Sequence, residues 1–169
     1  KGKVYRDYIK EAPIRLRVFR EKLKLLREYL PDDGKLLDVG AAAGFFLEAA
    51  QELKYETYGV EISEYASEFA RSKFRHNIIT GDFLKIDFPE DYFNVVTMWD
   101  VLEHFLNPFE ALKKSHKILK DNGVLVIETL NTDTLLFKIL REKWPLFAPP
   151  YHLYYFNKRN LTLALKNSG

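Results

Sequence analysis

Small residues and one aspartate lie together at residues 36–44, which read Leu-Leu-Asp-Val-Gly-Ala-Ala-Ala-Gly. An apolar run leads through these residues into a helical pattern. Small side chains let a ligand approach the backbone, and the start of a helix offers free N–H groups. Glu61 follows Gly40 by 21 residues, the spacing at which an acidic side chain accepts hydrogen bonds from ribose hydroxyls. The sequence therefore predicts an adenosine-type ligand at the C-terminal edge of a sheet. The alternative is that Gly40 and Gly44 serve only tight packing of strand against helix.

A nicotinamide site is the first competing interpretation of this loop. Dinucleotide-binding loops favour G-x-G-x-x-G, in which glycines let the backbone reach the pyrophosphate. The two glycines here are separated by three alanines. Asp38 would repel a diphosphate and attract a cationic amino group. The loop is therefore less suited to a dinucleotide than to a nucleoside that carries an amine.

The elements that must position these residues alternate between short apolar runs and helical patterns, which indicates an α/β fold with a mostly parallel sheet. A less regular, aromatic-rich stretch follows at 131–156, and Asn157 is expected to cap a last helix that reaches Leu165. The turn Asp121-Asn122-Gly123 is expected to precede the fifth strand. Predicted strands cover residues 35–40, 55–61, 77–82, 93–100 and 123–130, and predicted helices cover residues 44–53, 63–73 and 108–119.

The N-terminal segment is strongly basic, with ten Lys/Arg against three Asp/Glu in residues 1–27. Such a segment could meet an anionic substrate, nucleic acid or a membrane surface, or it could be a solvated helix face. One apolar stripe recurs at intervals of three and four residues, which favours a helix packed on the domain. Residues 1–34 are therefore predicted to form a basic helical lid or cap, with Tyr5 and Tyr8 as parts of it. The stripe comprises Leu16, Phe19, Leu23, Leu26 and Leu30.

Composition excludes several classes of function. The chain of 169 residues has no cysteine, so thiol nucleophiles, disulfides and Cys-ligated metals are ruled out. No pair of histidines has the H-E-x-x-H spacing, and no metal site is predicted. No apolar run approaches the ~20 residues of a membrane span, and a cytoplasmic location is expected.

Five motifs, in order and spacing, are similar to those of class I S-adenosylmethionine-dependent methyltransferases, and most of all to the small-molecule branch with ubiquinone-biosynthesis-type O-methyltransferases. The resemblance is strong over residues 35–130 and looser over 144–169. It implies a Rossmann-like, doubly wound sheet, from which the last strands of the family are apparently missing. The motifs are DVGAAAGFFLEAA, YGVEISEYA, ITGDFL, FNVVTMWDVLEH and KILKDNGVLVIET.

The resemblance also implies how S-adenosylmethionine would be held, and S-adenosylhomocysteine after it. Asp38 would bind the methionyl ammonium, and Glu61 would bind the ribose hydroxyls. Asp82 would accept from the adenine amino group. Ala42 replaces the family's middle loop glycine, which adds a methyl group near the cofactor. The complete set of expected cofactor residues is Asp38, Gly40, Ala41, Ala42, Gly44, Glu61, Ile62, Asp82, Phe83, Trp99 and Asp100.

Methyl transfer is an in-line displacement that needs alignment, and a base only where the nucleophile must lose a proton. By resemblance His104 lies on the substrate side of the site, and His152 lies in a loop that often covers the substrate. Either could be the base, and either could be structural. Tyr151 and Tyr155 are expected to face the substrate.

The leading hypothesis is methyl transfer to a small molecule, at oxygen rather than at nitrogen or carbon. One alternative is methylation of RNA or tRNA with the basic helix as a phosphate-contacting arm, although nucleic acid is the less expected partner. Another is a cofactor-binding module without chemistry. The domain itself is predicted to span residues 35–169, and the resemblance implies a truncated C-terminus. An unfinished sheet edge would invite a homodimer.

Overall fold

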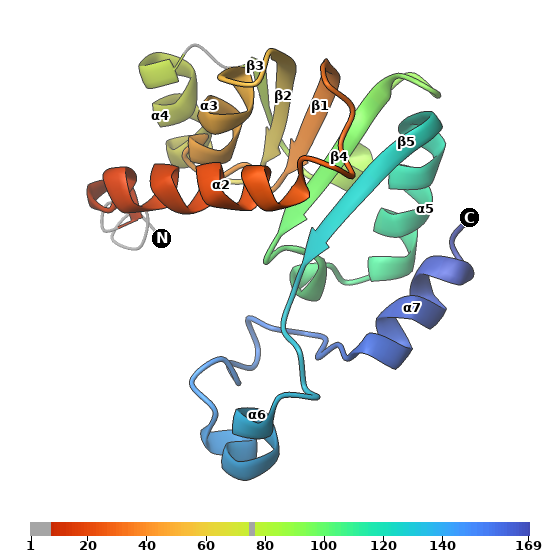
Figure 1. The fold of residues 1–169 in the computed structure, drawn as a ribbon. Coiled ribbons are helices and arrows are strands. Elements are labelled where there is room, and N and C mark those ends of the chain that lie inside the picture. Colours follow the sequence, from red (N-terminus) through yellow and green to blue (C-terminus); the bar gives the residue numbers. More distant parts are fainter. Residues whose placement is uncertain (1–7, 75–76) are drawn as a thin grey trace.

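The fold is built on one five-stranded parallel sheet (Figure 1). The computed structural model describes residues 8–74 and 77–169. Its strand order is β3-β2-β1-β4-β5, which confirms the predicted α/β, Rossmann-like sheet. The strands are β1 (Gly34–Val39), β2 (Tyr55–Glu61), β3 (Asn77–Thr80), β4 (Phe93–Trp99) and β5 (Leu119–Glu128).

Helices follow most strands, and polar side chains cap several of them. The Asn157 side chain accepts from the Asn160 N–H, which begins the last helix where the sequence predicts it. The Ser63 hydroxyl accepts from the Ala66 N–H at 3.4 Å in the same way. The helices are α2 (Ala12–Leu26), α3 (Phe45–Gln51), α4 (Glu64–Phe74), α5 (Pro108–Ile118), α6 (Leu135–Leu140) and α7 (Lys158–Lys166), with 3₁₀ turns η1 (Phe83–Lys85), η2 (Leu102–His104) and η3 (Arg141–Lys143).

The sheet is covered on both faces, because alternate strand residues enter two separate cores. On one face Leu36 and Val95 pack with Leu23 of α2 and Leu47 of α3. On the other face the core includes Leu112 of α5 and Ala164 of α7. Phe19 and Leu26 also pack on the first core, so the predicted apolar stripe of α2 does face the domain. No helix of the described residues is long and apolar enough to cross a membrane.

The strand order reverses at the centre of the sheet, where β1 lies between β2 and β4. In open parallel sheets of this kind a crevice forms outside the carboxyl ends of the strands at such a reversal. The loops after β1 and β4 therefore diverge, and the residues predicted to bind a ligand lie at that point.

The last third of the chain departs from the prediction. β5 begins at Leu119, and the predicted turn at Asp121-Asn122-Gly123 lies inside it as an irregularity: Phe93 pairs with Leu119, but Val95 pairs with Val124. Asn122 takes the positive φ of 61° that this bulge requires. The sequence also gave no signal for α6, which Thr134 caps through the Phe137 N–H. Figure 1 shows α6 standing away from the sheet, beyond the end of β5.

Candidate functional site

Two adjoining cavities open at the carboxyl ends of the strands. The smaller, of about 290 Å³, extends over Asp82 and Phe83 after β3, and the larger, of about 600 Å³, extends over Asp38 and Trp99 towards α2. Together they touch every predicted cofactor residue except Gly44, which serves instead as the N-cap of α3. Residues shared by both cavities are Gly40, Glu61, Ile62, Val101 and His104.

The loop after β1 is a cradle that excludes larger side chains. Gly40 has a φ of 77°, and a Cβ there would lie 2.4 Å from Cγ2 of Val101. The N–H groups of Gly40 and Ala41 both donate to the Val60 carbonyl, which fixes the loop to β2. Ala42 has a φ of 46°, a left-handed conformation that costs a residue with a Cβ roughly 1–2 kcal/mol. The alanine in place of glycine therefore strains the backbone as well as adding bulk.

Glu61 is held by the loop that it faces. The Ala42 N–H donates to one carboxylate oxygen of Glu61 at 2.9 Å, and the Ser63 N–H donates to the other at 2.7 Å. The side chain is almost entirely buried but lines both cavities. These two N–H groups fix the Glu61 carboxylate at the point where the two cavities meet.

Asp38 lies at the floor of the larger cavity and is 2% exposed. Burial raises the pKa of the Asp38 carboxyl to about 8, although the hydrogen bond from Thr97 at 2.6 Å works in the opposite direction. The nearby charge of Glu61 raises this pKa further. A nearby cation favours the charged form of a carboxyl, so binding of a cation beside Asp38 would promote loss of its proton.

Asp82 and Phe83 form the far wall of the smaller cavity. Asp82 caps η1 by accepting from the Leu84 N–H at 3.0 Å, so its carboxylate is fixed by the chain that follows. Phe83 is buried and packs against Phe88 and Phe105. Ile62 also lines this cavity and is 75% exposed. Phe83 and Ile62 thus offer apolar side chains to a flat ring that binds in the smaller cavity.

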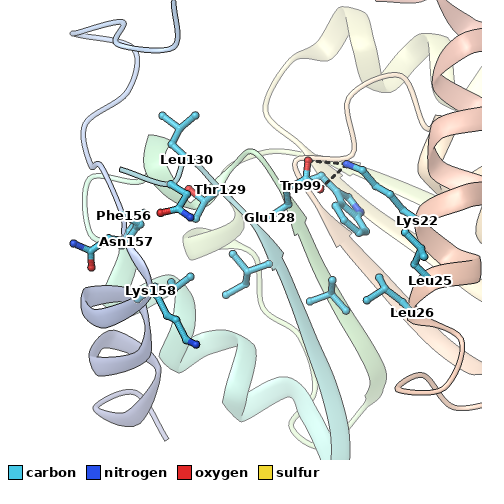
Figure 2. A pocket seen from close by; sticks show the side chains of 14 residues that line it. Lys22, Leu25, Leu26, Trp99, Glu128, Thr129, Leu130, Phe156, Asn157 and Lys158 are labelled. Atoms are coloured by element: carbon cyan, nitrogen blue, oxygen red, sulfur yellow. Dashed lines mark hydrogen bonds and ion pairs between the residues drawn. The ribbon is translucent and has the colours of Figure 1, made fainter. Parts of the chain in front are cut away.

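Trp99 ends β4, and it lines the larger cavity together with Asp100, the next residue. The Lys22 ammonium lies 4.7 Å from the Trp99 ring centroid and pairs with Glu128 of β5 at 2.6 Å. Figure 2 shows this ion pair beside the indole, where Lys22 and Trp99 also border a further cavity of about 450 Å³ along β5. Asp100 has a φ of 53°, and burial raises the pKa of its carboxyl.

Sequence reasoning predicted an N-terminal lid that includes Tyr8, but it did not assign Arg15 or Lys22 to the wall of the larger cavity. Tyr8, Arg15 and Lys22 line it, and the Arg15 guanidinium lies 3.6 Å from the Tyr8 ring centroid. The Arg15 Nε–H is buried and has no hydrogen-bond partner among the described residues. A signal was present, because the lining positions 8, 11, 15, 18 and 22 recur at intervals of three and four residues, beside the apolar stripe that packs on the core.

The two predicted base candidates lie together, with ring centroids of His104 and His152 4.9 Å apart. Only His104 lines the two cavities. Tyr151 is 75% exposed, and the Tyr155 hydroxyl accepts from the Ala148 N–H, so neither side chain is part of either cavity lining in the described residues. The substrate roles of Tyr151 and Tyr155 and the base roles of the histidines stay predictions. Tyr5 lies outside the described residues.

A family model described as a methyltransferase domain matches residues 8–169, and the chain belongs to that family. The fold and the motifs place it among the class I S-adenosylmethionine-dependent methyltransferases, as the sequence predicted. The chain is therefore a methyltransferase whose family uses S-adenosylmethionine as methyl donor. The buried Asp38 and the cradle at Gly40 fit such a donor, because they offer a carboxyl for its ammonium and a close approach to the backbone.

The relatives it resembles include an enzyme named ubiquinone biosynthesis O-methyltransferase from Pelagibacter ubique, 28% identical, with 91% of this chain and 73% of that protein covered. An uncharacterized protein of Methanocaldococcus jannaschii is 26% identical, with 89% and 65% covered. A crystal structure of an S-adenosylmethionine-dependent methyltransferase from Archaeoglobus fulgidus superposes with a TM-score of 0.76 at 26% identity, with 96% and 73% covered. The chain thus spans about two thirds to three quarters of the length of these proteins.

Proposed function

We propose that this methyltransferase transfers a methyl group from S-adenosylmethionine to an oxygen atom of a small-molecule acceptor. The observation that carries the proposal is the pair of adjoining cavities that share Glu61 and His104. The smaller has the size and walls for a nucleoside base, and the larger has room for an amino-acid moiety and an acceptor. The name of the Pelagibacter relative, an O-methyltransferase, supports oxygen as the acceptor atom.

The cofactor-binding roles follow from the chemistry of each group. Asp38 binds the methionyl ammonium, and Glu61 accepts from the ribose hydroxyls while the loop N–H groups hold its carboxylate. Asp82 accepts from the adenine amino group, and Phe83 and Ile62 flank the ring. To these we add Arg15, which pairs with Glu11 through one guanidinium nitrogen but whose buried Nε–H has no hydrogen-bond partner among the described residues. Arg15 lines the larger cavity and suits the methionyl carboxylate.

When bound, the cofactor supplies an electrophilic methyl group on a cationic sulfur, which needs no acid to leave. The protein must align the acceptor oxygen with that methyl group and take its proton. Trp99 and Asp100 border the reacting region, while α2 closes the larger cavity and excludes water. His104 lines both cavities and is the better placed base, with His152 behind it. Tyr151 and Tyr155 are proposed to contact the acceptor when it is bound.

Calorimetric titration with S-adenosylhomocysteine tests the cofactor site. We expect saturable one-to-one binding that Glu61→Ala weakens at least tenfold, since two ribose hydrogen bonds to a charged group are lost. Glu56→Ala is the matched control, because Glu56 lies on the same strand, outside the two cavity linings. Unchanged affinity in Glu61→Ala would show that the ribose assignment is wrong. Binding by the wild type then justifies a screen of phenols, carboxylates and sugars as acceptors.

The basic N-terminal segment does not favour an RNA substrate. Arg20 makes a bidentate ion pair with Glu52 of the domain, and Lys22 pairs with Glu128. Cations that are already paired are poor contacts for phosphates, so the small-molecule proposal stands ahead of methylation of RNA or tRNA. Binding to RNA with a steep salt dependence would reverse this order. A cofactor-binding module without chemistry is the remaining alternative, and turnover of any acceptor would exclude it.

A homodimer and a cytoplasmic location belong to the same proposal. β5 pairs with β4 and with no other described strand, so one of its edges is open to pairing. Sedimentation of the purified chain over a range of concentrations measures whether this edge is used.

A further inference from the structure

Glu103 is a buried acidic residue without a role in the cofactor site described above. It lies in η2, directly before His104, and is 0% exposed. The Thr129 hydroxyl donates to its Oε2 at 2.8 Å, but its Oε1 is buried without a hydrogen-bond partner among the described residues. An unsatisfied buried acceptor costs about 1–3 kcal/mol, and more when it is charged. Such a group requires a functional explanation.

The surroundings of Glu103 supply one. One ligand atom of its carboxylate, one ring nitrogen of His104 and one of His152 all lie within 4.8 Å of one another. The backbone carbonyl of Glu103 accepts from the N–H groups of Leu153 at 2.9 Å and Tyr154 at 3.3 Å. The residue therefore tethers the loop that carries His152 and places its own carboxylate beside both imidazoles.

Hydrogen bonds to backbone carbonyls fix the protonation pattern of both rings. The His104 Nδ1–H donates to the Tyr151 carbonyl at 2.7 Å, and the His152 Nδ1–H donates to the Leu146 carbonyl at 2.8 Å. A carbonyl oxygen can only accept, so Nδ1 carries the proton in each ring. In the neutral form, Nε2 of each ring is then an unprotonated acceptor. The two histidines can therefore accept a proton at Nε2. Beside them lies the Glu103 carboxylate, whose Oε1 has no hydrogen-bond partner among the described residues.

We propose that Glu103 is a positioning residue that holds His104 ready to take the acceptor's proton, its free carboxylate oxygen stabilising the charged histidine pair. This inference rests on the proposed function. In the step itself the acceptor O–H bond breaks and its proton goes to Nε2 of His104, while the acceptor oxygen bonds to the methyl carbon. The electron pair of the breaking carbon–sulfur bond goes to sulfur, so the charges balance as sulfonium becomes thioether and imidazole becomes imidazolium. The preformed negative charge beside the imidazolium stabilises the product of proton transfer without reorganisation.

Other charged and titratable groups surround this cluster and are included in the test. Asp100, after β4, interacts electrostatically with Glu103 and His104, as well as with Glu128 of β5 and Lys22 of α2. Within the loop the Tyr155 ring centroid lies 6.3 Å from that of His152. Asp100 is exposed and lines the larger cavity, whereas Glu103 is fully buried. The effect of Glu103 on the histidines should therefore exceed that of Asp100.

The experiment is NMR spectroscopy of the full chain with ¹⁵N-labelled histidine, saturated with S-adenosylhomocysteine. His104→Gln and His152→Gln assign the signals, which report the tautomer and the proton-binding constant of each ring. We expect Nδ1–H tautomers in the wild type and a roughly tenfold lower proton-binding constant for the histidine pair in Glu103→Gln, the effect of removing an opposite charge within ~4–6 Å. Asp100→Asn should change it less, and Glu110→Gln, at an exposed position of α5, should leave it unchanged.

Further measurements distinguish failure of this proposal from failure of the proposed function. Calorimetry with S-adenosylhomocysteine should give the same affinity for Glu103→Gln and wild type, and absence of binding by the wild type would contradict the proposed function alone. If Glu103→Gln does not fold, Thr129→Val removes the bond to Oε2 but keeps the charge, and it should leave the proton-binding constant equal or higher. An unchanged constant in folded Glu103→Gln overturns the proposal. Titration with Mg²⁺ or Zn²⁺ alone also overturns it if binding is found and is lost in Glu103→Gln, because the carboxylate would then be a metal ligand.

Discussion

Asp38 makes ligand binding depend on pH. Burial raises the pKa of its carboxyl to about 8, so at pH 7 the free protein holds a proton there. In the function proposed above, the methionyl ammonium displaces this proton. Affinity for S-adenosylhomocysteine should rise with pH between about 6 and 8, approaching tenfold per unit, and binding at pH 7 should release close to one proton. Calorimetry in buffers of different ionisation enthalpy measures this release. Asp38→Asn should bind more weakly and release none; release that persists in this variant would assign the proton to another group.

Ala42 is the residue at which this chain departs from the family's loop. Its φ of 46° places a Cβ in the left-handed region, and Ala42→Gly should therefore stabilise the protein by about 0.5–1 kcal/mol, the relief of strain exceeding the added freedom of the unfolded chain. Urea denaturation without ligand gives this free energy of unfolding. Ala43→Gly is the control, since Ala43 is buried and has no positive φ, and it should be destabilising. A destabilising Ala42→Gly would show that the alanine is not strained.

α2 is the element that forms one wall of the larger cavity at the sheet edge. Leu23 anchors one side of it in the core, and Lys22 reaches across to Glu128. Lys22→Gln should loosen the C-terminal half of α2, seen as faster amide exchange there, and should weaken S-adenosylhomocysteine binding several-fold. Lys24→Gln removes a cation of the same helix that pairs with exposed Glu21 and lines neither cofactor cavity, and it should change neither quantity. Equal effects of the two substitutions would mean that net charge matters and closure does not.

Local sequence patterns specify some of the secondary-structure elements, whereas others depend on contacts with distant parts of the chain. The parallel strands were predictable because each is an apolar run bounded by turn residues, and the turn after β1 because small residues there join a strand to a helix. The cofactor contacts of Gly40 and Glu61 stay predictions. β5 was placed four residues late, since Asp121-Asn122-Gly123 forms a turn in most settings and only pairing with β4 makes it a bulge. The position of Glu103 could not be predicted, because its burial depends on Thr129 and on a loop fifty residues later.

At the scale of the whole molecule, the buried carboxyl couples folding to pH and to the ligand. The folded state keeps the Asp38 proton up to pH 8, whereas the unfolded chain releases it near pH 4. The folded state thus binds more protons across this range, so this group lowers the stability of the ligand-free protein as pH rises from about 4 to 8, by roughly 1 kcal/mol per pH unit. Urea unfolding at several pH values measures the slope. Asp38→Asn should flatten it, and saturating S-adenosylhomocysteine should do the same while raising stability. A slope that is identical in Asp38→Asn would mean that the carboxyl is already ionised in the free protein, and that the site is preformed for a cation at neutral pH.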